Sequence, residues 1–170
     1  MDRGPSLQER YAPGSVCFGC GPANPIGLQI RSFDAPGRPD RVGHDPSGST
    51  DWETLADWAP PPNHDAFPGV LNGGIVSALL DCHGNWTAAT HLMRRRGIDA
   101  PPTTVTADLH VKLRRPTSSA RPVQLRARVV DADDERAAVE AELLSDGEVT
   151  ATARALFVAV RPGHPAYGRW

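Results

Sequence analysis

The segment 66–93 contains a single charged side chain, the carboxylate of Asp81. A carboxylate loses much of its hydration when it is buried, so it is seldom placed among small and apolar residues without a partner or a task. Asn72-Gly73-Gly74 lies nine positions upstream, where backbone N–H groups at a helix start are free to bind an oxygen that carries negative charge. Together, the carboxylate and the helix start indicate transfer of an acyl group to water.

A serine or cysteine nucleophile is not indicated by the sequence. There is no Gly-x-Ser-x-Gly motif. Cys82 and His83 are neighbours in the chain, so on a helix their side chains point about 100° apart and do not form a pair. Fixed hydrogen-bond donors and a carboxylate that directs water are sufficient to hydrolyse an activated ester such as a thioester.

A helix from Gly73 to about Arg96 is expected to carry Asp81. Apolar side chains recur there every three or four positions, which predicts a face packed into the core: Ile75, Leu79, Cys82, Trp86, Ala89 and Met93. A neighbouring stripe of small or polar residues is expected to line an open cleft: Gly74, Ser77, Ala78, Asp81, Gly84, Asn85 and Ala88. The run Arg94-Arg95-Arg96-Gly97 supplies cations for the helix C-terminus and a glycine to end it.

The rest of the chain favours antiparallel strands. Alternating side chains and turn residues predict strands at 27–33, 50–58, 105–114, 123–129, 137–144 and 149–160. Trp52 or Leu55 is expected to point inward, and Asp146-Gly147 to form a hairpin turn. Residues 1–25 are expected to be irregular and 161–170 to be a loose tail. Residues 1–170 are therefore interpreted as one α+β domain, in which an antiparallel sheet wraps around one long helix.

Composition excludes several classes of function. A net charge of −2 with 22% charged residues gives little support for a nucleic-acid or membrane partner that binds by bulk charge. Three cysteines and a polar start without a signal-peptide pattern indicate reduced thiols and a cytoplasmic protein. Cys17-x-x-Cys20 has the spacing of half a zinc site, but no second such pair exists, so no metal is expected.

Three stretches together resemble a known family. The segment 67–75, Phe-Pro-Gly-Val-Leu-Asn-Gly-Gly-Ile, followed by Leu79-Leu80-Asp81, resembles the hotdog-fold acyl-CoA thioesterases of the phenylacetyl-CoA thioesterase type. That family carries His-Gly-Gly and, nine positions after the histidine, an acidic residue on the central helix. The run 106–116, which ends in Arg-Pro, and the run 17–28 are also similar to segments of these proteins. The likeness covers roughly residues 15–160.

The resemblance implies a role for each matching residue. Asp81 would act as nucleophile or general base, the Gly73 amide would polarise the thioester carbonyl, and the Thr106 hydroxyl would hold the attacking water. Asn72 stands where the family usually has histidine. An asparagine amide can donate a hydrogen bond to the carbonyl, but it cannot carry a proton or a charge.

The resemblance also implies what the site binds. The substrate would be an acyl-CoA, with coenzyme A as part of the substrate and no separate cofactor. Gly74, Phe67 and His83 are expected to line the substrate pocket, and Arg114 and Arg115 to bind a phosphate group of coenzyme A. A homodimer or homotetramer with sites between subunits is expected.

Other interpretations of the same residues remain open. Asp81 could be a structural acid, and Asn72 an ordinary helix N-cap, which does not exclude a role in the site. Without a titrating group at Asn72, the chain could bind acyl-CoA without hydrolysing it. A hydratase would need an Asp, or a His with an Asn, on the loop that enters the helix, and His64 and Asp65 lie too far upstream.

Overall fold

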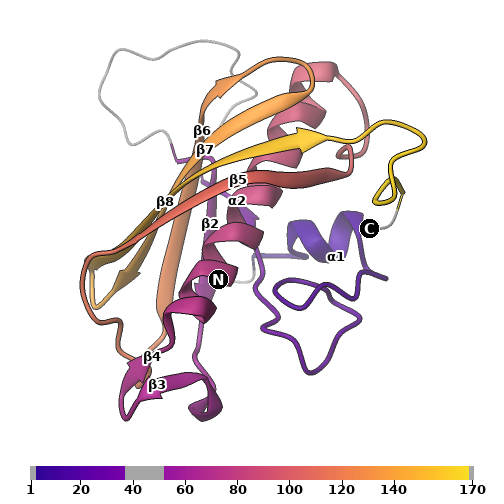
Figure 1. Cartoon of the computed structure of the whole chain (residues 1–170). Helices are drawn as coiled ribbons and strands as arrows, with labels where there is room; N and C mark the ends of the chain where they lie inside the picture. The colour runs from indigo at the N-terminus through magenta and orange to yellow at the C-terminus, as the bar shows by residue number, and fades with distance from the viewer. Residues whose placement is uncertain (1–2, 37–51, 169–170) are drawn as a thin grey trace.

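The protein is described by a computed structural model that covers residues 3–36 and 52–168. One long helix, α2 (Gly73–Arg96), lies against a curved antiparallel sheet of six strands in the order β1-β2-β6-β7-β8-β5 (Figure 1). The apolar side chains of the sheet's inner face and those of α2 form one core. This is the hotdog fold that the sequence predicts, with the antiparallel sheet wrapped around the helix.

The six strands differ widely in length. Their bounds are β1 Phe33–Asp34, β2 Thr54–Trp58, β5 Thr104–Leu113, β6 Val123–Ala132, β7 Arg136–Ser145 and β8 Glu148–Ala159. The remaining elements are short: α1 Leu7–Tyr11, the 3₁₀ turn η1 Pro62–His64, and a separate hairpin of β3 Asp65–Phe67 with β4 Val70–Leu71. Residues 161–168 contain neither helix nor strand. No helix among the described residues has both the length and the apolar character needed to cross a membrane.

Both ends of α2 are set by local sequence, as predicted. Asn72 is the N-cap, and its side-chain Oδ1 accepts a hydrogen bond from the Gly74 amide at 2.8 Å. Gly97 follows the last turn in the left-handed conformation, with φ of 63°, which a glycine adopts without steric cost. These caps fix where the helix starts, and hence where along the sheet Asp81 lies.

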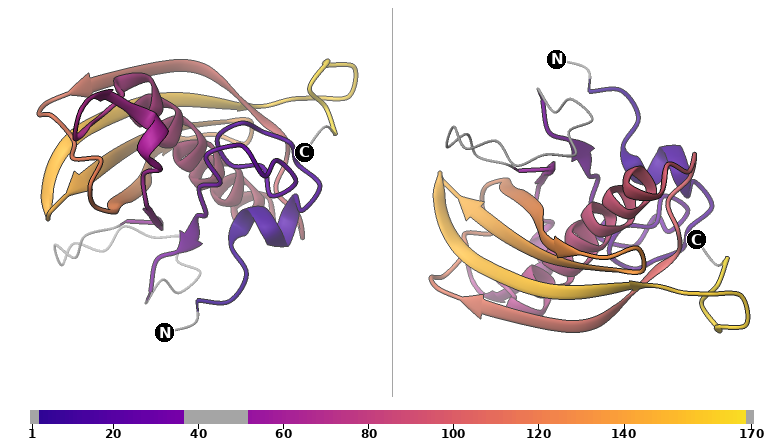
Figure 2. Two further views of the ribbon diagram at one scale, coloured as in Figure 1. Left: turned by 90° about the horizontal axis from the view of Figure 1, so that it is seen from below. Right: turned by 90° about the horizontal axis from the view of Figure 1, so that it is seen from above.

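α2 is enclosed on two sides, by the sheet and by the N-terminal segment (Figure 2). Leu79, Trp86 and Ala89 are buried, as the predicted apolar stripe requires. The prediction of an open cleft along Gly84 and Ala88 is wrong, because both residues are buried. A Cβ on Gly84 would press on the Phe157 ring of β8, so this glycine lets the helix approach the sheet closely.

The N-terminal segment differs from the prediction. The strand expected at 27–33 is reduced to β1, because Gln29 has φ of 57° and the amide of Ile30 bonds to the loop carbonyl of Gly19. Ile30 is fully buried and Ser32 hydrogen-bonds to His83 of α2, so residues 28–32 cover the helix, and only β1 joins the sheet. α1 was not expected in the irregular region, although Ser6 and Glu9 form a capping box, which is a sequence signal for a helix start.

The second predicted strand, 50–58, begins later and faces the other way. β2 starts at Thr54, and its inward residues are Ala56 and Trp58, not Trp52 or Leu55. Ala56 pairs with Leu125 of β6, and this register sets which side chains face the core. Residues 50 and 51 lie outside the described part of the chain.

The four C-terminal strands are confirmed. Asp146 and Gly147 both have positive φ, which suits the tight turn between β7 and β8. β5 forms an edge of the sheet, and among the described strands it pairs with β8 alone. A bulge between Thr106 and Asp108 interrupts that pairing, and it lies directly beside the residue that contacts Asp81.

Candidate active site

Asp81 and Thr106 meet where α2 crosses β5. The Thr106 hydroxyl donates a hydrogen bond to Asp81 Oδ1 at 2.8 Å. One turn further along the helix, the side chains of Asn85 and Thr104 also hydrogen-bond to each other. These two contacts tie the edge strand to the helix, so the position of the Asp81 carboxylate is fixed from both elements.

The β5 bulge explains why Thr106 faces the helix. Thr106 pairs with Phe157, whose side chain is buried beneath α2, so the two side chains share the inner face of the sheet. Ala107 is the extra residue, and after it Leu109 takes over the inward position opposite Ala155. The simple alternation predicted for this strand placed Thr106 on the opposite face from Leu109, so the bulge is what brings the hydroxyl to the carboxylate.

The surroundings of Asp81 make its carboxylate more basic. Burial raises the pKa of this half-buried carboxyl, the hydrogen bond from Thr106 lowers it, and negative charge at Cys17 raises it further. The net direction is upward from the ordinary aspartate value. Asp81 is therefore a better proton acceptor than a surface aspartate.

The helix start lies apart from Asp81 within one chain. Asp81 follows Gly73 by eight positions, which at 1.5 Å per residue is about 12 Å along the helix axis. Within one chain, a small group such as a thioester therefore cannot contact both the Gly73 amide and the Asp81 carboxylate. Asn72 uses its side-chain oxygen as a cap on Gly74, which leaves its NH₂ group as the donor available to a ligand.

Other predicted substrate-binding residues gather at the helix start. A Cβ on Gly73 would touch Leu113 at the end of β5, so the next two residues, Arg114 and Arg115, lie at the same end of the molecule. Both arginines are exposed, and Arg115 pairs with Glu148 at 2.7 Å. The hairpin β3–β4 leads into the same helix start.

The structure buries His83 in the core, away from the surface. Its side chain is fully buried, with Nδ1 2.9 Å from Ser32 Oγ and Nε2 3.2 Å from Thr54 Oγ1. Burial lowers the pKa of His83 to about 4, so the ring is neutral at neutral pH. The prediction that His83 lines the pocket is corrected: this ring joins the N-terminal segment and β2 to the helix within the core.

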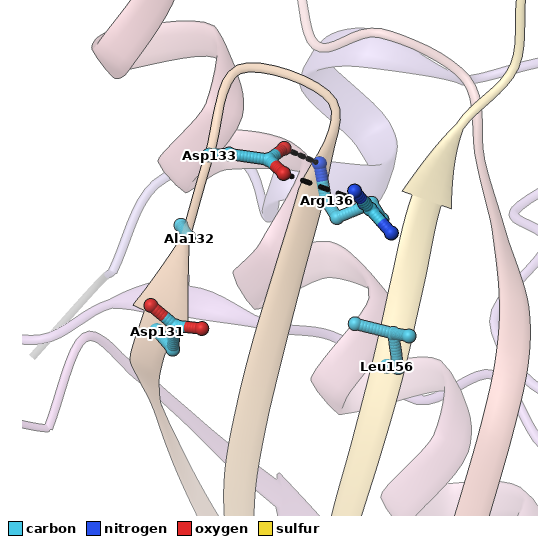
Figure 3. Close-up of a pocket in the computed structure, with 5 residues that line it drawn as sticks. All are labelled: Asp131, Ala132, Asp133, Arg136 and Leu156. Atoms are coloured by element: carbon cyan, nitrogen blue, oxygen red, sulfur yellow. Dashed lines mark hydrogen bonds and ion pairs between the residues drawn. The ribbon is translucent and has the colours of Figure 1, made fainter.

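A hollow of about 320 Å³ lies elsewhere, at the turn between β6 and β7 (Figure 3). The Asp133 carboxylate accepts hydrogen bonds from the backbone amides of Glu135 and Arg136 and pairs with the Arg136 side chain at 3.3 Å. These groups satisfy one another and hold the hairpin turn. Leu156, which lines the hollow, lies on the opposite face of β8 from the buried Phe157 that pairs with Thr106, so the hollow and Asp81 are on different sides of the sheet, and we assign no chemistry to it.

A group of thiols beside Asp81 was missed by sequence reasoning. The Sγ atoms of Cys17, Cys20 and Cys82 lie within 4.8 Å of one another. Hydrogen bonds from the thiols of Cys20 and Cys82 lower the pKa of the Cys17 thiol. The Cys17-x-x-Cys20 spacing is a sequence signal, but its meeting with Cys82, 65 positions later, depends on the fold.

The fold and a match of sequence together give the family of this chain. The sequence profile of the thioesterase-like superfamily matches residues 61–162. The chain therefore belongs to the thioesterase-like superfamily. Comparison with curated proteins gives no match.

Solved structures of other proteins are similar to this chain. A thioesterase superfamily protein from Shewanella loihica PV-4 is 28% identical, over 64% of this chain and 83% of its own, with a TM-score of 0.54. A phenylacetic acid degradation-related protein from Ralstonia eutropha JMP134 is 23% identical, over 62% and 75%, with a TM-score of 0.51. A protein from Bacillus halodurans, solved with CoA, is 21% identical, over 64% and 68%, with a TM-score of 0.51. The last two likenesses concern the fold alone.

Proposed function

We propose that this chain hydrolyses an acyl-CoA thioester to a free acid and coenzyme A, with Asp81 as the catalytic carboxylate. The observation that carries the proposal is the 2.8 Å hydrogen bond from Thr106 to Asp81 Oδ1 in a thioesterase-like fold. This hydrogen bond fixes one carboxylate oxygen and leaves the other, Oδ2, to accept a proton from water or to attack the thioester carbon. Within residues 3–36 and 52–168, no side-chain hydrogen bond to Oδ2 is found.

Two routes use the same groups. As a general base, Asp81 takes a proton from water while the water oxygen bonds to the thioester carbon. As a nucleophile, Asp81 bonds to that carbon itself and gives an anhydride, which water then opens. In both routes the carbon–sulfur bond breaks and the departing thiolate of coenzyme A takes up a proton. The Gly73 amide and the Asn72 NH₂ group stabilise the negative charge that develops on the carbonyl oxygen.

A complete site requires a second copy of the chain. A thioester is too small to contact both Gly73 and Asp81 of one chain, because they lie about 12 Å apart along the helix. A two-fold arrangement solves this, since each copy then presents its helix start to the Asp81 of the other. The outer edge of β5 supports such an arrangement, because no strand in residues 3–36 or 52–168 pairs with it there and its ten residues offer their backbone to another chain.

The helix start suits coenzyme A. Arg114 and Arg115 provide guanidinium groups for phosphate, and the helix N-terminus itself favours anions. Phe67 and Leu113 are 71% and 58% exposed, so apolar surface is available there for an acyl group or a second copy. The similar fold from Bacillus halodurans that was solved with CoA supports this choice of ligand. The Ralstonia eutropha neighbour makes phenylacetyl-CoA the first acyl group to test.

The test is release of free thiol from a panel of acyl-CoA esters by the full-length chain. Asp81→Asn keeps the size of the side chain and removes the base, so kcat should fall by about 10²- to 10⁴-fold. The matched control is Asp108→Asn, because Asp108 is an exposed carboxylate on the same strand as Thr106. Turnover that survives in Asp81→Asn would remove the proposed mechanism.

A non-catalytic acyl-CoA binding protein is the second candidate. The observation that favours it is Asn72, whose oxygen is already committed to capping Gly74 and whose amide cannot titrate. Such a protein would bind acyl-CoA saturably in calorimetry without releasing coenzyme A. The thiol-release assay therefore separates the two candidates directly.

A further inference from the structure

The three cysteines of the chain meet at one point on α2, next to Asp81. Cys17 and Cys20 come from the N-terminal loop and Cys82 from the helix. Their Sγ atoms all lie within 4.8 Å of one another. The thioesterase proposal uses none of these thiols, so the cluster needs its own explanation.

The spacing of the sulfurs fits a single tetrahedral metal ion. Zn–S bonds of about 2.3 Å at tetrahedral angles place two sulfurs about 3.8 Å apart. The Sγ atoms of Cys17 and Cys82 are 3.8 Å apart. A disulfide would require about 2.05 Å and would leave the third thiol without a role.

Two glycines let the loop reach the helix. A Cβ on Gly19 would collide with the Cys82 sulfur, and one on Gly21 would collide with the backbone of Ser15 and Cys17. The turn is closed by the Gly21 amide, which donates to the Cys17 carbonyl at 2.9 Å. Side chains at these glycines would separate the two halves of the cluster.

The loop is also fixed by groups outside the cluster. The Leu28 amide donates to the Phe18 carbonyl at 2.7 Å, and the Ile30 amide donates to the Gly19 carbonyl at 3.0 Å. The Trp86 indole N–H donates to Cys20 Sγ at 3.4 Å. Donors to a sulfur stabilise its thiolate form and orient it, as second-layer groups do around metal sites.

We propose that Cys17, Cys20 and Cys82 bind one Zn²⁺ ion as three thiolates, which clamps the N-terminal loop to α2. Thiolates are soft ligands and select zinc over magnesium or calcium. The fourth position of the tetrahedron faces away from the three sulfurs and takes water, since Cys17 lies at the exposed side of the cluster. The zinc site adjoins the Asp81 region, but it does not depend on thioester hydrolysis.

The test is titration of the reduced, metal-free full-length chain with Zn²⁺ in competition with a chromogenic chelator. We expect one Zn²⁺ per chain and a rise in the unfolding temperature with zinc concentration, because a ligand that binds only the folded state stabilises it. Co²⁺ in place of Zn²⁺ should give the intense visible bands of a tetrahedral thiolate site. A wild-type chain that binds no Zn²⁺ in this titration would overturn the proposal.

Variants locate the ion. Cys17→Ser should weaken zinc binding by more than about 100-fold, beyond the loss expected for a second-layer group. Phe18→Ala is the matched control, because this exposed side chain lies in the same loop and offers no ligand; its affinity should equal that of the wild type. Equal affinity in Cys17→Ser and Phe18→Ala would overturn the site. The proposal would also be overturned if mass spectrometry of the air-exposed chain shows a Cys17–Cys82 disulfide and the reduced chain binds no zinc.

Discussion

The Thr106 hydroxyl donates to Asp81 Oδ1 at 2.8 Å across 25 positions of sequence, and it joins the edge strand to the central helix. The bond fixes the carboxylate plane, so the second oxygen points in one direction without the entropy of a free side chain. The Thr106 oxygen still has lone pairs that can accept a hydrogen bond from water. One hydroxyl can therefore orient both the base and the water that the base activates.

Thr106→Val should lower kcat by about tenfold or more, because it keeps the shape of the side chain and removes a hydrogen bond to a charged group. Thr106→Ser restores the hydroxyl and should recover most of the lost rate. The measurement is steady-state thiol release for the three proteins. Equal rates for Thr106→Val and the wild type would show that the hydroxyl takes no part in hydrolysis.

Gly73→Pro tests the proposed oxyanion donor without breaking the helix. Position 73 is the first helical residue, where proline is tolerated, and its backbone is outside the left-handed region. The change removes the amide N–H and should lower kcat by about 10²- to 10³-fold.

Gly73→Ala is the control, since it adds a Cβ against the exposed Leu113 but keeps the amide N–H. It should stay within a few-fold of the wild type in the same assay. A loss in Gly73→Ala as large as in Gly73→Pro would point to packing against Leu113, and not to the amide, as the cause.

The predictable parts of the fold are those determined by residues that are close together in the sequence. Asn72 and Gly97 set the ends of α2 through their own hydrogen bond and backbone conformation, and Asp146-Gly147 sets its hairpin turn in the same way. The long C-terminal strands follow from alternation. Asp81 was identifiable because a lone acid in an apolar helix is unusual wherever the helix lies.

What could not be predicted depends on contacts between distant segments. The stripe of small residues was expected to line an open cleft, but Gly84 and Ala88 are buried against the sheet. Nothing near these residues in sequence indicates that contact. The meeting of Cys17 with Cys82 needs the N-terminal loop to fold back on the helix. The distance from Gly73 to Asp81, in contrast, follows from the helical rise alone and is therefore predictable from sequence.

The N-terminal segment should contribute strongly to stability, although it adds little regular structure. Ile30→Ala removes a fully buried side chain of the core and should lower the free energy of unfolding by about 2–5 kcal/mol. Ile26→Ala is the matched control, because Ile26 is 91% exposed in the same segment and its loss should cost less than about 0.5 kcal/mol. Urea unfolding followed by circular dichroism measures both. Equal losses would mean that residues 28–32 do not pack on the helix as described.

Mixing two inactive variants tests whether each site is shared between two chains. Asp81→Asn lacks the base and Gly73→Pro lacks the amide donor, so neither should be active alone. If Gly73 of one copy serves Asp81 of the other, a mixed dimer holds one intact site and one site without either group. Random exchange makes half of the dimers mixed, so the mixture should recover about a quarter of the wild-type rate.

The control for the mixing experiment is Asp81→Asn with Asp81→Ala, which cannot form an intact site in any combination. Exchange is driven by unfolding and refolding the mixture, and size-exclusion chromatography with light scattering verifies that dimers have re-formed. If dimers have re-formed and the mixture still shows no thiol release, Gly73 and Asp81 do not act together in one site. Because one chain holds them about 12 Å apart along α2, such a result would also remove the Gly73 amide as the group that polarises the thioester.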